Sequence, residues 1–162
     1  MYIFPSQVFF NPNNLFLDSI NELDGHIIEM GCGVGRTLVR MKEYGGVVDN
    51  CNMYNSRGFD IIARTECEAP TQVAYGHMFD ALEFKFYTKL MNVLVCRPDH
   101  GGWVGTLLNQ FLSGEKTCKR FIYVGLERNL TIDFDPIQLG AVSQVIENVG
   151  DDEENMYIWE IS

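Results

Sequence analysis

The stretch HIIEMGCGVGR, residues 26–36, sets an apolar run against three glycines at alternate positions. The apolar run predicts a buried strand over residues 26–30, and the glycines predict a turn in which the backbone lies close to another group. The residues after the turn, 35–45, predict a short helix. A glycine-rich turn between a strand and a helix can be a bare turn, a phosphate cradle or the wall of a nucleotide pocket.

The rest of the chain continues this alternation of strands and helices. Cap residues and apolar spacing predict helices over 11–25 and 101–115, and β-rich runs predict strands over 46–49, 71–76, 92–96 and 120–126. Residues 55–69 are predicted as a helix, although FDIIA (59–63) is equally compatible with a strand. Residues 143–150 and 156–161 flank the acidic turn DDEEN and predict an antiparallel hairpin with a charged, solvated tip. Together these elements predict a doubly wound α/β fold with a mostly parallel sheet and a C-terminal antiparallel hairpin.

Length and charge restrict the classes of function. The 162 residues, 46% of them hydrophobic, predict a single domain over residues 1–162. The chain has 22 acidic and 12 basic residues, and its formal charge of -10 opposes binding to nucleic acid or to an anionic membrane. The N-terminus carries Pro5 and no early Lys or Arg, which disfavours secretion, and no apolar run approaches the roughly 20 residues that span a bilayer, which disfavours membrane insertion.

The cysteines indicate a reducing environment. The five cysteines are widely spaced and include no CxxC pair, so neither a disulfide framework nor a zinc site is expected, and no metal is predicted. A cytoplasmic location is the simplest setting. Cys32 and Cys96 are expected to be small packing residues rather than nucleophiles, because no histidine or cation lies nearby in sequence to lower the pKa of either thiol.

The spacing of the glycines distinguishes between nucleotide ligands. A dinucleotide-binding turn has the pattern GxGxxG, whereas Gly31, Gly33 and Gly35 form GxGxG and the bulky Arg36 follows. This spacing disfavours a nicotinamide-dependent oxidoreductase. The chain also lacks the GxxxxGK[ST] string of a P-loop, which excludes nucleoside triphosphate binding by that route.

The motif IIEMGCGVGR resembles the first motif of class I S-adenosylmethionine-dependent methyltransferases, in which an acidic residue precedes GxGxG. Downstream, GGVVDNCNM resembles the second strand of that family, VAYGHMFDAL its third-strand region and NVLVCRPDH its fourth motif. The similarity of order extends over about residues 14–162. The resemblance implies a Rossmann-like methyltransferase fold, S-adenosylmethionine as the cofactor, and methyl transfer to a small molecule or a protein side chain.

The resemblance also assigns cofactor-binding residues. Glu29 would offset the positive charge of the amino-acid moiety of the cofactor. Asp49 would accept hydrogen bonds from both ribose hydroxyls, and Glu66 is the alternative if residues 59–66 form the second strand. Recognition of the adenine would involve the region after the third strand, where backbone groups or Asp80 are alternatives to the usual acid. The remaining assigned residues are those of the glycine turn, those near the adenine and the last of the fourth strand: Gly31, Cys32, Gly33, Gly35, His77, Met78, Phe79 and Cys96.

The segment CRPDHGGW, residues 96–103, lies where the family places the transferred methyl group. It lacks the Asn-Pro-Pro-Tyr and Asp-Pro-Pro-Tyr signatures of amino-directed nucleic-acid methyltransferases. Three catalytic candidates lie here: Arg97 as a ligand for an acceptor carboxylate or phosphate, Asp99, and His100 as a general base, with Trp103 as an aromatic wall. The competing interpretation is structural: Arg97 pairs with Asp99, His100 caps the next helix and Trp103 fills the core.

The chain leaves little length for a substrate-recognition lid, so self-association or a partner protein is expected to complete the site. The alternative function is a non-catalytic, methyltransferase-like protein that binds a partner through its acidic surface.

Tyr157 and Trp159 are expected in the core or in the hairpin.

Overall fold

The computed structural model describes residues 10–31, 36–45, 57–60, 73–75, 91–98 and 102–161. These residues form a seven-stranded sheet with the strand order β3-β2-β1-β4-β5-β7-β6. Neighbouring strands from β3 to β5 are parallel, and β7 is antiparallel to both β5 and β6. The strands are β1 (His26–Met30), β2 (Arg57–Asp60), β3 (Val73–Tyr75), β4 (Met91–Cys96), β5 (Arg120–Gly125), β6 (Gln144–Ile146) and β7 (Asn155–Glu160).

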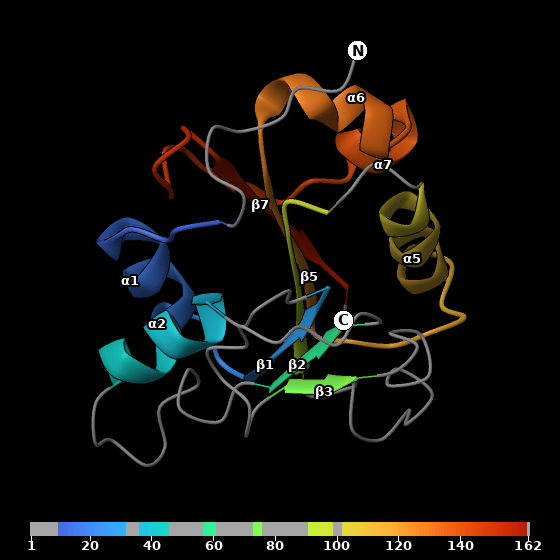
Figure 1. Cartoon of the computed structure of the whole chain (residues 1–162). Coiled ribbons are helices and arrows are strands. Elements are labelled where there is room, and N and C mark those ends of the chain that lie inside the picture. The colour runs from blue at the N-terminus through green and yellow to red at the C-terminus, as the bar shows by residue number, and fades with distance from the viewer. Residues whose placement is uncertain are drawn as a thin grey trace.

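Helices cover both faces of this sheet (Figure 1). Helices α1 (Asn14–Glu22) and α2 (Arg36–Gly45) lie on one side, here called the α1 face. Helix α5 (Trp103–Leu112) lies on the other side, here called the α5 face, together with the short elements η1 (Glu127–Asn129), α6 (Leu130–Asp133) and α7 (Pro136–Gly140). The expected doubly wound architecture is therefore confirmed.

Side-chain alternation along the central strands builds two separate cores. In β1, Ile27 packs with α1 and α2, whereas Ile28 and Met30 pack on the α5 face. The same alternation in β4 places Cys96 on the α1 face. Because both faces of the central strands are covered, their residues are apolar almost without interruption, as parallel strands require.

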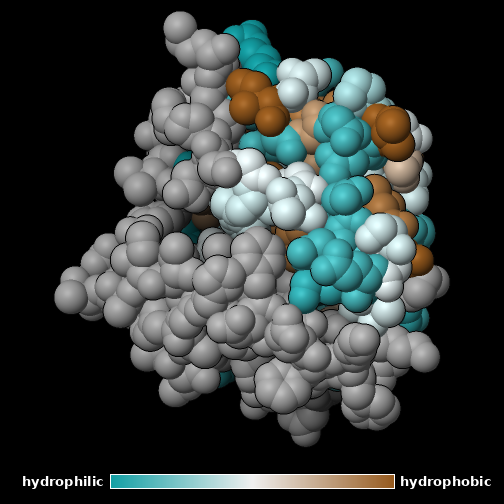
Figure 2. Space-filling model, turned by 90° about the vertical axis from the view of Figure 1, so that its right-hand side faces the viewer, coloured by the Kyte–Doolittle hydropathy of each residue, from teal (hydrophilic) through white to brown (hydrophobic). Residues whose placement is uncertain are grey.

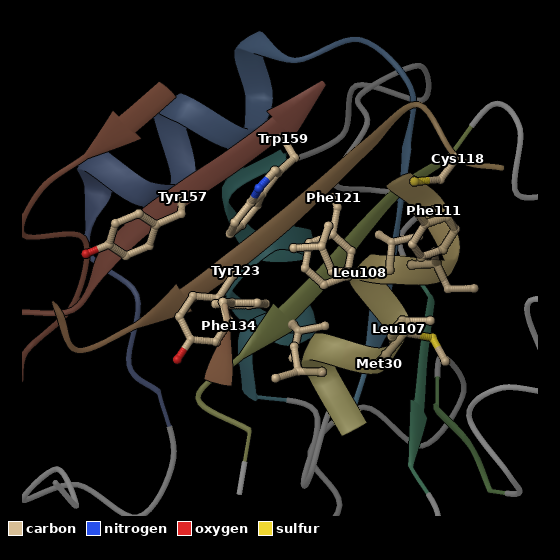
Figure 3. Close-up of a cluster of buried hydrophobic side chains, with 14 of the residues drawn as sticks. Met30, Leu107, Leu108, Phe111, Cys118, Phe121, Tyr123, Phe134, Tyr157 and Trp159 are labelled. Atoms are coloured by element: carbon tan, nitrogen blue, oxygen red, sulfur yellow. The ribbon is translucent and has the colours of Figure 1, made fainter. Parts of the chain in front are cut away.

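Aromatic side chains fill the core of the α5 face (Figure 3). The centroids of contacting rings lie 4.9 to 6.1 Å apart, within the range of favourable aromatic pairs. The polar ends of two rings are satisfied: Trp159 Nε1 donates to the Gln138 carbonyl at 2.8 Å, and the Tyr123 hydroxyl donates to Asp133 Oδ2 at 2.6 Å. The expected core positions of Tyr157 and Trp159 are confirmed.

Most of the predicted elements are found near their predicted bounds, but one is wrong. Residues 57–60 of the segment predicted as a helix form β2, which pairs in parallel with β1 and β3. This tertiary pairing overrides the weak helical pattern, and the strand alternative stated for FDIIA is nearer to the structure. The elements η1, α6 and α7 were not predicted. The sequence does contain a signal for α7, because Asp135 at the N-cap followed by Pro136 is a typical helix start. The strand predicted over 46–49 lies outside the described residues.

Candidate functional site

The carboxyl ends of β1 and β4 bring the first candidate residues together. The two strands are parallel neighbours, with Glu29 of β1 level with Leu94 of β4. Glu29 lies two residues after Ile27 and therefore faces the same side of the sheet, the side that also contains Cys96. Parallel α/β sheets bind their ligands beyond this edge, so Glu29 and Cys96 lie where a cofactor is expected.

Glu29 is a buried carboxylate, with 2% of its surface exposed. Two residues later, Gly31 has a φ of 74°, a left-handed backbone conformation that residues other than glycine rarely adopt. The glycine-rich turn therefore begins with a backbone shape that requires glycine.

Cys96 is a buried thiol rather than a nucleophile. Burial raises the pKa of Cys96 well above its ordinary value, and the Glu29 and Glu154 carboxylates raise it further. A hydrogen bond from Thr37 and the charge of Arg97 act in the opposite direction. The thiol therefore remains protonated at neutral pH, in agreement with the packing role expected from the sequence.

Arg97 follows β4 in an unusual backbone conformation, with a φ of 46°. Its N–H donates to the Val124 carbonyl at 2.7 Å, which fixes this residue at the end of the adjacent strand β5. Its guanidinium Nη1 lies 3.1 Å from Glu154 Oε2 and 3.5 Å from Asp152 Oδ2. Both of these carboxylates belong to the β6–β7 turn, whereas Asp99, the partner expected in the structural interpretation, lies outside the described residues.

The β6–β7 turn differs from the expected solvated tip. Asp151 and Glu153 are exposed, but the side chain of Glu154 is fully buried against Arg97. The backbone N–H of Asp152 donates to Glu154 Oε1 at 2.9 Å. The expectation fails at Glu154 because a long-range ion pair compensates the burial of this carboxylate.

Two hollows lie near the carboxyl edge of the sheet. The first, of 440 Å³, lies between the segment after β5 and the β6–β7 turn and is lined by Leu126, Glu127, Arg128, Glu147, Asn148, Glu153 and Asn155. The second, of 690 Å³, is a shallow groove between α5 and the α6–α7 segment. Figure 2 shows the α5 side of the molecule, where apolar residues on the described part of the surface lie among hydrophilic ones.

Trp103 packs against the core of the α5 face and is half-buried, which supports its structural interpretation. The residue at the N-cap of α5 is Gly102 rather than His100. Several predicted site residues lie outside the described part of the chain and are not placed: Cys32, Gly33, Gly35, Asp49, Glu66, His77, Met78, Phe79, Asp80, Asp99 and His100.

Within the described ranges, no three His, Cys, Asp or Glu side chains converge into a group that could hold a metal ion. The helices in the same ranges include none with the length and hydrophobicity needed to cross a membrane.

Comparisons by sequence give no match, either to a protein-family model or to a curated protein. Comparison by structure gives several. A candidate tRNA (m1A22) methyltransferase from Streptococcus pneumoniae is similar with a TM-score of 0.59 and 12% identity, over 92% of this chain and 68% of that one. The METTL16 methyltransferase domain is similar with a TM-score of 0.57 and 11% identity, over 92% of this chain and 64% of that one.

A third similar structure is a precorrin-6y C5,15-methyltransferase from Geobacter metallireducens, with a TM-score of 0.55 and 10% identity, over 91% of this chain and 86% of that one. The chain spans about two thirds of the length of the first two structures. At identities of 10 to 12% these likenesses show the fold. The chain has the Rossmann-like fold of class I methyltransferases.

Proposed function

We propose that this chain binds S-adenosylmethionine and transfers its methyl group to a small molecule or to a protein side chain. The observation that carries the proposal is the buried Glu29 carboxylate, followed by the left-handed Gly31, at the carboxyl end of β1, an interior strand of a methyltransferase fold. The proposal includes the cytoplasmic location expected from the cysteine pattern.

The polar groups at this edge of the sheet fit the cofactor. Glu29 is an acceptor group in a buried position, and the ammonium of the cofactor supplies both the hydrogen-bond donors and the positive charge that such a group favours. Gly31 begins the turn, and Gly33 and Gly35 would keep the space beyond it free of side chains. Cys96 and, in the third-strand region, His77, Met78 and Phe79 would complete the binding site. The bound cofactor supplies a methyl group activated by a positive sulfonium.

The ribose-binding acid requires a choice among three residues. Asp49 and Glu66 are the residues favoured by the sequence. The strand that pairs with β1 is β2, however, and β2 ends at Asp60. In the resemblance the ribose acid comes from the end of the second strand, so Asp60 joins the candidates, and its backbone lies at the carboxyl end of β2.

In the part of the site that binds the methyl acceptor, Asp99 and His100 would position the nucleophile and accept its proton. Methyl transfer is a direct displacement, in which correct positioning supplies much of the rate enhancement. The net charge of -10 favours a neutral or cationic acceptor over a nucleic acid. Self-association or a partner protein is proposed to complete this side.

Calorimetric titration with S-adenosylmethionine and with its demethylated product tests the proposal. We expect saturable binding of one equivalent and a rise in melting temperature. The Gly33→Arg variant, in which the new side chain would fill the binding site, should show neither effect. Binding by the wild-type chain without turnover on amine, carboxylate or peptide acceptors would favour the alternative, a methyltransferase-like binding protein.

A further inference from the structure

We propose that Arg97 is a positioning residue, whose ion pair with Glu154 fastens the β6–β7 turn and the N-terminal segment into one wall at the carboxyl edge of the sheet. This edge wall consists of residues 10–13 and 148–154. Its existence follows from the contacts below, whereas its effect on the methyl donor rests on the proposed function.

The ion pair is built into the interior of the protein. The side chain of Arg97 is only 8% exposed and that of Glu154 is fully buried, while Asp152 contributes a second carboxylate at 3.5 Å. Two charges removed from water to this extent require each other, because a buried charge without its partner is strongly unfavourable. The guanidinium is therefore committed to the turn and is poorly placed to serve an acceptor.

Glu154 organises the turn around itself. Its Oε1 accepts from the Asp152 N–H at 2.9 Å, and its carbonyl accepts from the Val149 N–H at 2.8 Å. Gly150 packs so closely against this carboxylate that a Cβ there would lie 2.5 Å from Glu154 Oε1 and 2.5 Å from a ring carbon of Phe10. A side chain at position 150 would therefore displace the Glu154 carboxylate or the Phe10 ring, at the point where the turn and the N-terminal segment meet.

Backbone contacts join the N-terminal segment to the turn. The Asn13 N–H donates to the Val149 carbonyl at 3.0 Å, and its Nδ2 donates to the Asn148 carbonyl at 2.7 Å. Pro12 and Gly150 form an isolated antiparallel bridge. Asn11 Nδ2 donates a further hydrogen bond to Asp151 Oδ2, across 140 positions of the sequence. The ion pair that fixes Glu154 therefore also fixes residues 10–13 through these contacts.

The edge wall lies beside the proposed donor site and also lines a hollow. Glu154 Oε2 lies 3.1 Å from Nη1 of Arg97, which directly follows Cys96 of the α1 face, and the charges of Glu154 and of Glu29, the proposed partner of the donor ammonium, both raise the pKa of the Cys96 thiol. Within the edge wall, Asn148 and Glu153 line the 440 Å³ hollow. One ion pair therefore holds a segment that contacts the end of β4 and also lines this hollow.

Hydrogen exchange of individual amides tests the ion pair without any ligand. In Glu154→Gln the side chain keeps its shape and loses its charge, and we expect the amides of Asn13, Val149 and Asp152 to exchange about tenfold faster or more. The matched control is Asp152→Asn, which removes the same charge at the longer distance and should change these rates by less than about threefold. The amides of Ile122 and Ile158, in the centre of β5 and β7, should not change in either variant.

A double variant separates positioning from stability. Arg97→Met combined with Glu154→Met replaces the buried pair by apolar groups, a change that often leaves stability unaltered. We expect its melting temperature to be near that of the wild type, while the Asn13 and Asp152 amides still exchange fast and S-adenosylmethionine binds about tenfold more weakly. The single variant Arg97→Lys retains the positive charge, so its Asn13 and Asp152 amides should exchange more slowly than those of the double variant.

Unchanged exchange in Glu154→Gln, or full protection and wild-type donor affinity in the double variant, would overturn the positioning role. Absence of S-adenosylmethionine binding by the wild-type chain would instead overturn the proposed function, and the exchange rates would still decide whether Arg97 fastens the edge wall.

Discussion

At the scale of single residues, the buried carboxylate of Glu29 is the group on which the proposed cofactor site depends. A Glu29→Gln variant keeps the shape and the burial of the side chain but loses its charge. We expect affinity for S-adenosylmethionine to fall by about 1–3 kcal/mol, the value of a charge-assisted hydrogen bond. Stability should not fall, because a neutral amide is less costly to bury than a carboxylate. Calorimetry and thermal unfolding measure the two effects.

The matched control is Glu43→Gln on the exposed surface of α2, which removes the same charge away from the sheet. It should leave affinity unchanged. Equal losses in both variants would mean that Glu29 acts only through the overall charge of the protein.

The Tyr123–Asp133 hydrogen bond is a second residue-scale feature, with both groups buried on the α5 face. Tyr123→Phe removes the hydroxyl and should lower the free energy of unfolding by about 1–3 kcal/mol, because a buried acceptor loses its donor. Urea denaturation measures the change. Tyr44→Phe, on the exposed surface of α2, is the control and should cost less than about 0.5 kcal/mol. A neutral Tyr123→Phe would contradict the importance of this bond.

At the scale of elements, the position of β2 favours Asp60 as the acid of the proposed ribose site. We expect Asp60→Asn to weaken binding of the demethylated product by about tenfold or more, because Asp60 ends the strand that pairs with β1. Asp49→Asn and Glu66→Gln are the matched comparisons, and their effects should be within about threefold of wild type. A larger loss in either one, measured by the same titration, would return the role to that residue.

The elements also show what the sequence could predict. Strands β1, β4 and β5 were predictable because compact runs rich in apolar residues, bounded by turn signals, favour buried strands, and the pairing of a buried Glu29 with Gly31 was predictable from the motif. Strand β2 was not, because a short strand at this position is defined by its neighbours on both sides. Glu154 was not predictable either, since a run of four acids is typical of a solvated turn and its ion pair spans 57 residues.

At the scale of the whole molecule, two buried thiols predict a response to alkaline pH. Burial raises the pKa of both Cys96 and Cys118 above the ordinary value of 9.0. The folded protein therefore keeps protons that the unfolded chain releases above about pH 9. Their contribution to stability is complete below pH 9 and decreases as pH rises, by at most about 1.4 kcal/mol per pH unit for each thiol.

Urea denaturation between pH 8 and pH 10.5 measures this dependence. The slope should become shallower in Cys118→Ala, which removes one of the two groups. A slope that is unchanged by this substitution would show that other groups cause the alkaline loss of stability.

The central claim for the whole molecule is that its methyltransferase fold binds S-adenosylmethionine at the edge formed by β1 and β4. The most direct measurement is calorimetric titration of the wild-type chain with S-adenosylmethionine, followed by thermal unfolding at about a hundredfold excess over the dissociation constant. The account predicts one saturable site and a stabilisation of roughly 2.7 kcal/mol, a shift of several degrees. No heat of binding and no thermal shift at millimolar ligand would contradict it.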